Sequence, residues 1–329
     1  MDMGIEGNGA TLGLLPERIS NAVTALVESL KINVISEEVR RKRPVLVKRR
    51  TGTSEQISEM ANLYFSWCGL PIRFWSKVDD WRRWETDSFN MLNGDRFRAR
   101  PSGQRCVIED KLPGESLWDH MNRGTLTRKM MAAAAQEFHR AHQFWSDEFG
   151  GPWSHGDATT PNVIYHSQTG RARLIDFEII HQRTLPARLR HADDLLVFLL
   201  DMVGIVSSRQ WLPFALEFLR AYNEPKVVRE LKKQLMLSGG LAWIWWEVRT
   251  NFTAPGKIKL RLRRLREAID QLEAYRFAPT VRARKSRFPS ITCHVMRPGI
   301  PIAKSRNRAI SEIANAVSPG MPSRLPITR

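Results

Sequence analysis

The chain has 329 residues, enough for about two structural units with a buried core, and its 42% hydrophobic and 26% charged residues are typical of a globular protein. Its net charge of +17 is concentrated at one end, because residues 276–329 contain eleven Lys or Arg and a single acid, Glu312. Three scattered cysteines without CxxC spacing, Cys68, Cys106 and Cys293, exclude a disulfide framework and a zinc site and indicate a reducing compartment.

The hydropathy pattern predicts no segment that crosses a membrane. The chain does not open with a basic region followed by an apolar run, so no signal peptide is expected. The longest apolar run, residues 195–206, is shorter than a membrane span and contains Asp201. We therefore expect a cytoplasmic protein that is soluble or attached peripherally to the inner face of the membrane.

The first 30 residues are expected to form a loose leader followed by a helix. Apolar residues recur there at helical spacing, namely Ile19, Val23, Leu26 and Leu30. A phosphate-binding glycine loop needs a strand on each side, so the Gly-Asn-Gly at residues 7–9 is not predicted to be one.

Residues 31–50 are predicted to form a pair of strands. The second ends in an apolar run that is followed directly by Lys48. Alternation of Val45 and Val47 with Leu46 fits a buried strand. The alternative for Lys48 is that it belongs to the solvated basic run at residues 40–43.

Two amphipathic helices are predicted next, and each carries one glutamate of interest. The first contains Glu59 and lies in an aromatic-rich segment at residues 53–78, whereas the second contains Glu85 and leads into strands near Phe97 and Cys106. Buried packing is the common explanation for the aromatic segment, and a membrane-interface surface is the alternative. Its aromatic and large apolar residues are Tyr64, Phe65, Trp67, Ile72, Phe74 and Trp75.

The strand that starts at Cys106 is predicted to end in a turn at residues 113–114, followed by a helix. A core helix follows at residues 126–145, where apolar side chains recur every three or four positions. Its histidines, His139 and His142, are predicted to lie on the polar face or to pack, not to bind a ligand.

Most of the chain after residue 186 is predicted to be helical. Asp193 and Asp194 introduce a helix that is apolar on nearly every side and is therefore expected to be buried. Further helices are expected at residues 211–222, 227–247 and 257–275.

Two features distinguish the C-terminal part. Residues 257–275 combine an apolar stripe with many Lys and Arg, a pattern suited to an anionic surface, whereas residues 241–246 are expected in the core. Prolines and scattered basic residues predict a disordered tail from residue 276, with a short helix at residues 310–317.

The stretch from Trp153 to Glu178 carries residue types that phosphoryl transfer requires. Asp157 can accept the proton of an attacking hydroxyl, and Asn162, five residues later, offers a carboxamide oxygen. Two short strands joined by a Ser-Gln-Thr-Gly turn would return Asp176 towards Asn162. A carboxamide oxygen and a carboxylate are hard ligands that suit magnesium bound to nucleotide phosphates. The spacing therefore predicts a phosphotransfer site.

In these residues the chain resembles the protein-kinase-like superfamily, in the branch of aminoglycoside phosphotransferases and lipopolysaccharide-core sugar kinases, where His-Gly-Asp replaces the His-Arg-Asp of protein kinases. The resemblance makes Asp157 the catalytic base and Asn162 and Asp176 the magnesium ligands, with Glu178 in place of the usual Gly. It covers roughly residues 35–250 and implies a two-lobed α+β fold, with a small mixed N-lobe, a mostly helical C-lobe and a nucleotide cleft between them.

The resemblance also assigns a phosphate-holding lysine and its partner. Lys48 would hold the nucleotide phosphates and pair with a glutamate of the next helix. Glu85 is preferred because its helix leads directly into the following strands, and Glu59 is the alternative.

Three further roles follow from the resemblance. Backbone groups from Glu109 to Lys111, at the hinge between lobes, would contact adenine. An acid at the start of the buried helix, Asp194 or Asp193, would brace the catalytic loop. His155 would support the same loop.

The predicted organisation has four parts. They are a leader and helix at residues 1–30, an N-lobe at 31–110 with an insertion at about 53–78, a C-lobe at 111–275, and a basic tail at 276–329.

The implied activity is transfer of the γ-phosphoryl group of ATP, with Mg²⁺, to a hydroxyl of a sugar or glycolipid. One alternative is a pseudokinase or scaffold, which the lack of a recognisable glycine-rich loop favours; another is a phosphotransferase that acts on a protein or a soluble small molecule. The basic tail and the aromatic segment predict peripheral contact with an anionic membrane. No RNA or DNA motif accompanies the tail, so a nucleic-acid partner is not expected.

Overall fold

The computed structural model describes residues 32–236, 246–247, 249–250 and 253–277, all within the first of two units, Met1–Ala278. The predicted leader helix at residues 1–30, most of the apolar run at 241–246, and the tail from residue 278 lie outside the described residues. None of the described helices is long and apolar enough to span a bilayer.

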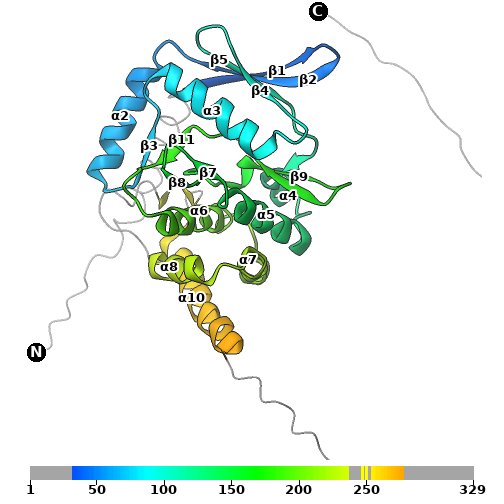
Figure 1. The fold of residues 1–329 in the computed structure, drawn as a ribbon. Coiled ribbons are helices and arrows are strands. Elements are labelled where there is room, and N and C mark those ends of the chain that lie inside the picture. Colours follow the sequence, from blue (N-terminus) through cyan, green and yellow to red (C-terminus); the bar gives the residue numbers. More distant parts are fainter. Residues whose placement is uncertain (1–31, 237–245, 248, 251–252, 278–329) are drawn as a thin grey trace, which may run out of the picture. The chain divides into compact units, whose positions relative to one another are not determined.

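The N-terminal half of the described chain is built on a four-stranded antiparallel sheet (Figure 1). The predicted strand pair at residues 31–50 is confirmed as its first two strands. The sheet order is β1-β2-β5-β4, and its strands are β1 (Asn33–Arg40), β2 (Arg43–Arg50), β4 (Ala99–Ser102) and β5 (Cys106–Asp110).

Alternation along β2 places two kinds of side chain on its two faces. Val45 and Val47 are buried against Ile108 on one face. Lys48 and Arg50 are buried on the other, which α3 (Val78–Asn93) covers. Because side chains alternate with period two, the apolar run that buries the valines also directs Lys48 towards α3.

The aromatic-rich segment folds as a helix and a short strand, α2 (Ser54–Trp67) and β3 (Ile72–Phe74). β3 pairs antiparallel with β11 (Ile179–His181), which follows the second half of the phosphotransfer motif. The buried guanidinium of Arg50 donates from Nη1 to Ser58 Oγ at 3.1 Å and to the Trp75 carbonyl at 2.9 Å. The segment is therefore held to the sheet and to the C-terminal half at once.

The aromatic residues of this segment divide between core and surface. Phe65 and Trp75 are buried, so the expectation that they help to form a membrane-facing surface is wrong. Trp67 is 85% exposed and lies on the same side of α2 as Met60 and Leu63, which are 69% and 71% exposed. Their spacing of three and four residues makes one apolar stripe on α2.

The second half is mostly helical. Its helices are α4 (Leu117–Asn122), α5 (Arg128–Ala141), α6 (Ala187–Asp201), α7 (Ser208–Tyr222), α8 (Pro225–Gln234) and α10 (Pro255–Phe277), and its remaining strands are β6 (Glu115–Ser116), β7 (Trp145–Ser146), β8 (Gly151–Pro152), β9 (Val163–His166) and β10 (Arg171–Leu174). Phe138, Phe198 and Phe218 join α5, α6 and α7 in an aromatic cluster with ring centroids 4.5–5.9 Å apart. The apolar run that follows Asp194 in α6 is buried in this core, as predicted.

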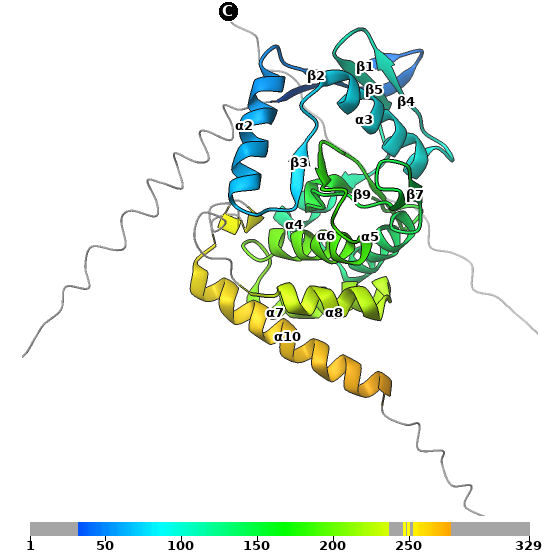
Figure 2. The same ribbon diagram turned by 60° about the vertical axis from the view of Figure 1, so that its left-hand side comes forward.

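Two predictions about the later helices need correction. The helix expected over residues 227–247 ends at Gln234. The apolar stripe of α10 does not face outward, because Ile258, Leu262 and Leu265 are buried and α10 lies along α7 and α8 (Figure 2). α10 is amphipathic, because Lys257, Lys259, Arg263 and Arg264 are exposed on its outward face while its apolar stripe packs in the core.

A small antiparallel sheet crossed by one long helix, followed by a mostly helical part, is the two-lobed α+β arrangement that the sequence predicts. That prediction is confirmed. We refer to residues 32–110 as the N-lobe and to the described residues from 111 onward as the C-lobe.

Candidate active site

The carboxylate of Asp194, on α6, holds the loop that carries Asp157 through hydrogen bonds to its backbone. Asp194 accepts hydrogen bonds from the backbone N–H groups of His155 and Gly156, both at 2.8 Å. A buried carboxylate that accepts two N–H bonds fixes the loop's path, because an unpaired N–H there would carry a desolvation cost. Asp194 rather than Asp193 therefore holds the loop.

Histidines surround this carboxylate. His142 Nε2 lies 3.0 Å from Asp194 Oδ2, and its Nδ1 lies 2.8 Å from the Tyr222 hydroxyl. Although burial favours the protonated carboxyl, the neighbouring His181 and His142 hold the pKa of Asp194 below its usual value. His142 is thus part of the loop's support. Only its helical position was visible in the sequence, and this contact was not predicted.

A second histidine stacks on the first. The rings of His142 and His191 are parallel, with centroids 3.9 Å apart. Burial and the proximity of His142 lower the pKa of His191 to about 2. Burial also lowers the pKa of His142, so both rings are neutral at physiological pH. Their neutrality supports folding near pH 7, and that stability is lost as pH falls below the usual histidine pKa of about 6.5.

Gly156 is required by a close approach within the loop. Its φ is +88°, and a Cβ placed there would lie 2.6 Å from the Ile179 carbonyl. Any side chain at this position would push the loop away from β11. The preceding His155 is buried, and its Nε2 lies 3.0 Å from the Ile175 carbonyl, so His155 links the loop to the residue before Asp176.

Asp157 and Asn162 form a hydrogen-bonded unit. The Asn162 carboxamide nitrogen donates to the Asp157 carbonyl at 2.9 Å and lies 3.4 Å from Asp157 Oδ2. With its nitrogen used in this way, the carboxamide presents its oxygen on the other side. Burial raises the pKa of Asp157 to about 7, although Arg249 acts in the opposite direction.

The hairpin predicted between Asn162 and Asp176 is confirmed as β9 and β10. The Ile175 N–H donates to the Asn162 carbonyl at 3.0 Å and so brings Asp176 beside Asn162. Asp176 itself has a φ of +65°, a left-handed conformation that non-glycine residues adopt at some energetic cost. Backbone strain at this position is of the kind often found at functional sites.

Lys48 joins the two lobes at this point. Its ammonium group forms an ion pair with Glu85 Oε1 and lies 3.1 Å from Asp176 Oδ1. Glu85 uses its second oxygen to accept the Phe177 N–H at 3.1 Å. Glu59, the alternative partner, is exposed on α2 and makes no contact with Lys48. Three elements therefore meet at one buried ion pair: β2, α3 and the segment after β10.

Two more carboxyl groups lie close by. Glu109 Oε1 is 3.4 Å from Lys48 Nζ. Burial raises the pKa of Glu109 and of Glu178, and neighbouring carboxylates act in the same direction. Burial opposes the charge of Lys48, but Asp176, Glu109 and Glu85 keep its pKa above the usual value. The side chain of Glu109 thus belongs to the charge cluster, a role that was not predicted for it.

A cavity of about 260 Å³ lies beside this cluster, between the lobes. Leu46 and Glu109 of the N-lobe and Ile164 and Ile175 of the C-lobe contribute to its lining, together with the hinge. Apolar side chains above and below a backbone edge suit a flat heterocyclic base.

One of the hinge groups predicted to meet such a base is already paired within the chain. The Lys111 N–H donates to the Pro44 carbonyl at 3.1 Å and is not free. The next donor is the Leu112 N–H, which makes no hydrogen bond within the described part of the chain. Gly114 keeps the hinge close to β9, because a Cβ there would lie 2.2 Å from the Tyr165 carbonyl.

The polar groups fit a magnesium ion that also binds phosphate. Among the described residues, no three His, Cys, Asp or Glu side chains form a ready metal cage. Asn162 and Asp176 instead offer one carboxamide and one carboxylate oxygen, and Mg²⁺ in nucleotide sites typically takes one or two protein oxygens plus phosphates and waters. The donor set therefore suits Mg²⁺ with a nucleotide.

The two lobes, the loop held by Asp194 and the Lys48–Glu85 pair define a protein-kinase-like fold. No protein-family model matches the sequence, nor does any curated protein. Among solved structures, ethanolamine kinase from Plasmodium vivax aligns with a TM-score of 0.39 and 9% identity over 72% of this chain and 79% of that one. A Mycobacterium tuberculosis protein solved in complex with erythromycin aligns with a TM-score of 0.34 and 13% identity over 73% and 70%. Likenesses this distant carry no argument about function.

The ion pair leads to a double-mutant prediction. Lys48→Ala and Glu85→Ala should each reduce phosphotransfer strongly, and the double variant should be far less impaired than the product of the two effects, because the residues act through one contact. Steady-state rates of the four proteins test this. Glu59→Ala is the matched control and should keep wild-type activity; strictly multiplicative losses would show that Lys48 and Glu85 act separately.

The raised pKa of Asp157 leads to a pH prediction. A carboxylate accepts a proton only when ionised, so activity should fall tenfold per unit below about pH 7. The rates should be measured with both substrates well below saturation, because they then depend on the ionisation of Asp157 in the free enzyme. Arg249→Gln removes a charge that lowers this pKa and should move the acid limb to higher pH. An acid limb near pH 4 in both proteins would remove Asp157 from the rate-limiting ionisation.

Proposed function

We propose that this protein is a kinase that transfers the γ-phosphoryl group of ATP to a hydroxyl of a sugar or glycolipid. The observation that carries the proposal is the convergence of Asp157, Asn162, Asp176 and Lys48 from both lobes. Each has the chemistry that the reaction needs at that place. The neighbouring cavity is lined by Glu109, which contacts Lys48, and by Ile175, which precedes Asp176.

The residues divide the work between acceptor and nucleotide. Asp157 accepts the proton of the attacking hydroxyl, and its raised pKa suits a base that works near neutral pH. Lys48, already fixed by Glu85, holds phosphate oxygens, while Asn162 and Asp176 hold Mg²⁺, which neutralises phosphate charge when bound. Catalysis then rests on positioning and electrostatic stabilisation.

A pseudokinase or scaffold remains the rival function. It would not need a lysine linked to both Glu85 and Asp176, or a base held beside Asn162. Burial of these charges is unfavourable in free energy, and binding of nucleotide phosphates and proton transfer would give them a function. The geometry therefore supports an active kinase over a scaffold.

Two substitutions distinguish the role of the base, Asp157, from that of the metal ligand, Asp176. Asp157→Asn should lower turnover by at least a hundredfold and leave MgATP affinity almost unchanged, because Asp157 acts on the acceptor. Asp176→Ala should weaken MgATP binding itself, since a direct ligand is lost. Calorimetric titration measures the affinity for MgATP. Turnover is measured with labelled ATP, by analysis of the products formed from sugar, lipopolysaccharide, aminoglycoside and protein pools. Full activity in Asp157→Asn would contradict the proposed mechanism.

We also propose that the protein contacts anionic membranes peripherally. The stripe of Met60, Leu63 and Trp67 offers apolar groups to an interface. The turn between β1 and β2 exposes Arg41 and Lys42, with φ of +51° and +64°, and the tail adds many cationic residues. Near an anionic leaflet each Lys or Arg contributes about 1 kcal/mol.

Vesicle co-sedimentation tests this contact. Binding to anionic but not neutral liposomes should be lost mostly in high salt, because salt screens the charges. The salt-resistant remainder should disappear in a Leu63→Ala, Trp67→Ala double variant. Trp145→Ala, which changes another exposed tryptophan, is the control and should retain it. A protein that stays in the supernatant with anionic vesicles at low salt would refute membrane contact.

A further inference from the structure

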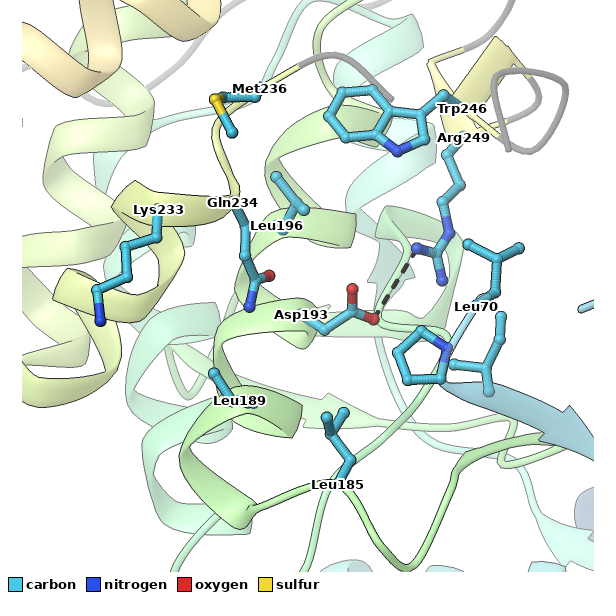
Figure 3. A pocket seen from close by; sticks show the side chains of 12 residues that line it. Leu70, Leu185, Leu189, Asp193, Leu196, Lys233, Gln234, Met236, Trp246 and Arg249 are labelled. Atoms are coloured by element: carbon cyan, nitrogen blue, oxygen red, sulfur yellow. Dashed lines mark ion pairs between the residues drawn. The ribbon is translucent and has the colours of Figure 1, made fainter. Parts of the chain in front are cut away.

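A second cavity, of about 360 Å³, is lined by residues of both the N-lobe and the C-lobe (Figure 3). Its walls come from the residues before and within β3, from α6 and the residue Leu185 before it, from the end of α8, and from Trp246 and Arg249. The insertion that brings β3 to β11 therefore supplies one wall of this cavity. The cavity is not the nucleotide cleft, because none of its lining residues lines the cavity at the hinge.

The walls of this cavity are mainly apolar. Leucines on facing elements line it, namely Leu70 before β3, Leu185 before α6, and Leu189 and Leu196 on α6. Trp246 and Met236 lie on the opposite side (Figure 3). A ligand that is polar all over would leave hydroxyl groups facing these walls without hydrogen-bond partners, which is unfavourable.

Polar side chains interrupt the apolar lining at two places, namely Lys233 and Gln234 at the end of α8, and the pair of Asp193 and Arg249. Asp193 Oδ2 lies 3.9 Å from Arg249 Nη1, and Figure 3 shows the two side chains pointing toward each other within the cavity. Both side chains are largely buried. A polar ligand group could therefore find a donor and an acceptor at this position and nowhere along the leucines.

The charged pair connects the cavity to the catalytic loop. Asp193 Oδ2 lies 3.2 Å from His181 Nε2, and His181 Nδ1 lies 3.0 Å from the hydroxyl of Ser154, three residues before Asp157. Arg249 is also close enough for its positive charge to act on Asp157. Asp193 and Arg249 are thus the lining residues through which the cavity connects to the catalytic loop.

We propose that this cavity binds the acceptor and that the acceptor is an amphipathic alcohol. Its polar head lies at the Asp193–Arg249 pair with one hydroxyl near Asp157, and its apolar body lies against Leu70, Leu185 and Leu189. The inference rests on the proposed kinase function and selects, within it, a lipid-linked or alkyl-bearing acceptor over a free sugar.

The proposed transfer replaces one oxygen–phosphorus bond with another. The acceptor oxygen forms a bond to the γ-phosphorus as the bond from that phosphorus to the β,γ-bridging oxygen breaks. The hydroxyl proton passes to Asp157, and ADP leaves with the bridging oxygen. The apolar body takes no part in the chemistry and contributes binding and orientation.

Two glucosides that differ only in alkyl length test the proposal. Octyl and methyl β-glucoside, the former below its micelle concentration, are titrated calorimetrically into full-length protein that holds Mg²⁺ and a non-hydrolysable ATP analogue. We expect octyl glucoside to bind at least tenfold more tightly. Leu189→Asn should weaken octyl binding at least fivefold without affecting methyl glucoside, because it removes an apolar wall and leaves the polar end intact.

The control places the same substitution at an exposed apolar residue. Leu260→Asn changes an exposed leucine on α10 that does not line the cavity, and octyl binding should not change. Leu185→Asn is the second cavity variant if Leu189→Asn lowers the melting temperature. Equal affinity for the two glucosides, or octyl binding that both cavity variants retain, would overturn the proposal.

Measurements of turnover distinguish a wrong acceptor class from a wrong kinase function. Phosphoryl transfer from labelled ATP to free sugars, with no gain from an alkyl chain, would support the kinase function and overturn the acceptor class. Octyl binding of the expected kind, in a protein that neither binds MgATP nor transfers phosphate to any acceptor, would overturn the kinase function instead.

Discussion

The ammonium group of Lys48 is the point on which both lobes depend. A lysine removed from water needs compensating charge, and here Glu85, Asp176 and Glu109 provide it from three different elements. Removal of one partner from a buried ion pair typically costs ~3–5 kcal/mol, so this contact fixes the position of α3 against β2. Because Glu85 also holds the Phe177 N–H, the same contact sets where Asp176 lies.

A second buried carboxylate holds the site from the C-lobe. Asp194 fixes the backbone of the loop, and the ring of His142 lies 3.0 Å from the same carboxylate. Lys48 and Asp194 thus act on opposite sides of Asp157 and Asp176. Asp157 and Asp176 are half-buried, whereas Glu85, Asp194 and His142, which position the site, are fully buried. This division lets the reacting groups meet ligands while their supports remain rigid.

The parts of the site that could be predicted are those whose geometry is local. Asp157, Asn162 and Asp176 lie on one loop and one hairpin, so spacing alone brings them together. Chain order selected Glu85 over Glu59. The role of His142 could not be predicted, because its partner Asp194 is 52 residues away and its helical spacing is equally typical of a surface residue. Burial of Phe65 and Trp75 depends on the pairing of β3 with β11, which no local pattern reveals.

That pairing has a consequence for regulation. Only eight residues separate Glu178 from α6, and the first three are held in a two-stranded sheet by Ile72, Arg73 and Phe74. A segment so short and so firmly paired has little slack with which to swing out of the cleft, and Gly156 offers no cation to a phosphate group on it. For the proposed kinase function, a phosphate group on this segment would therefore have neither the slack nor the cationic partner to switch the site.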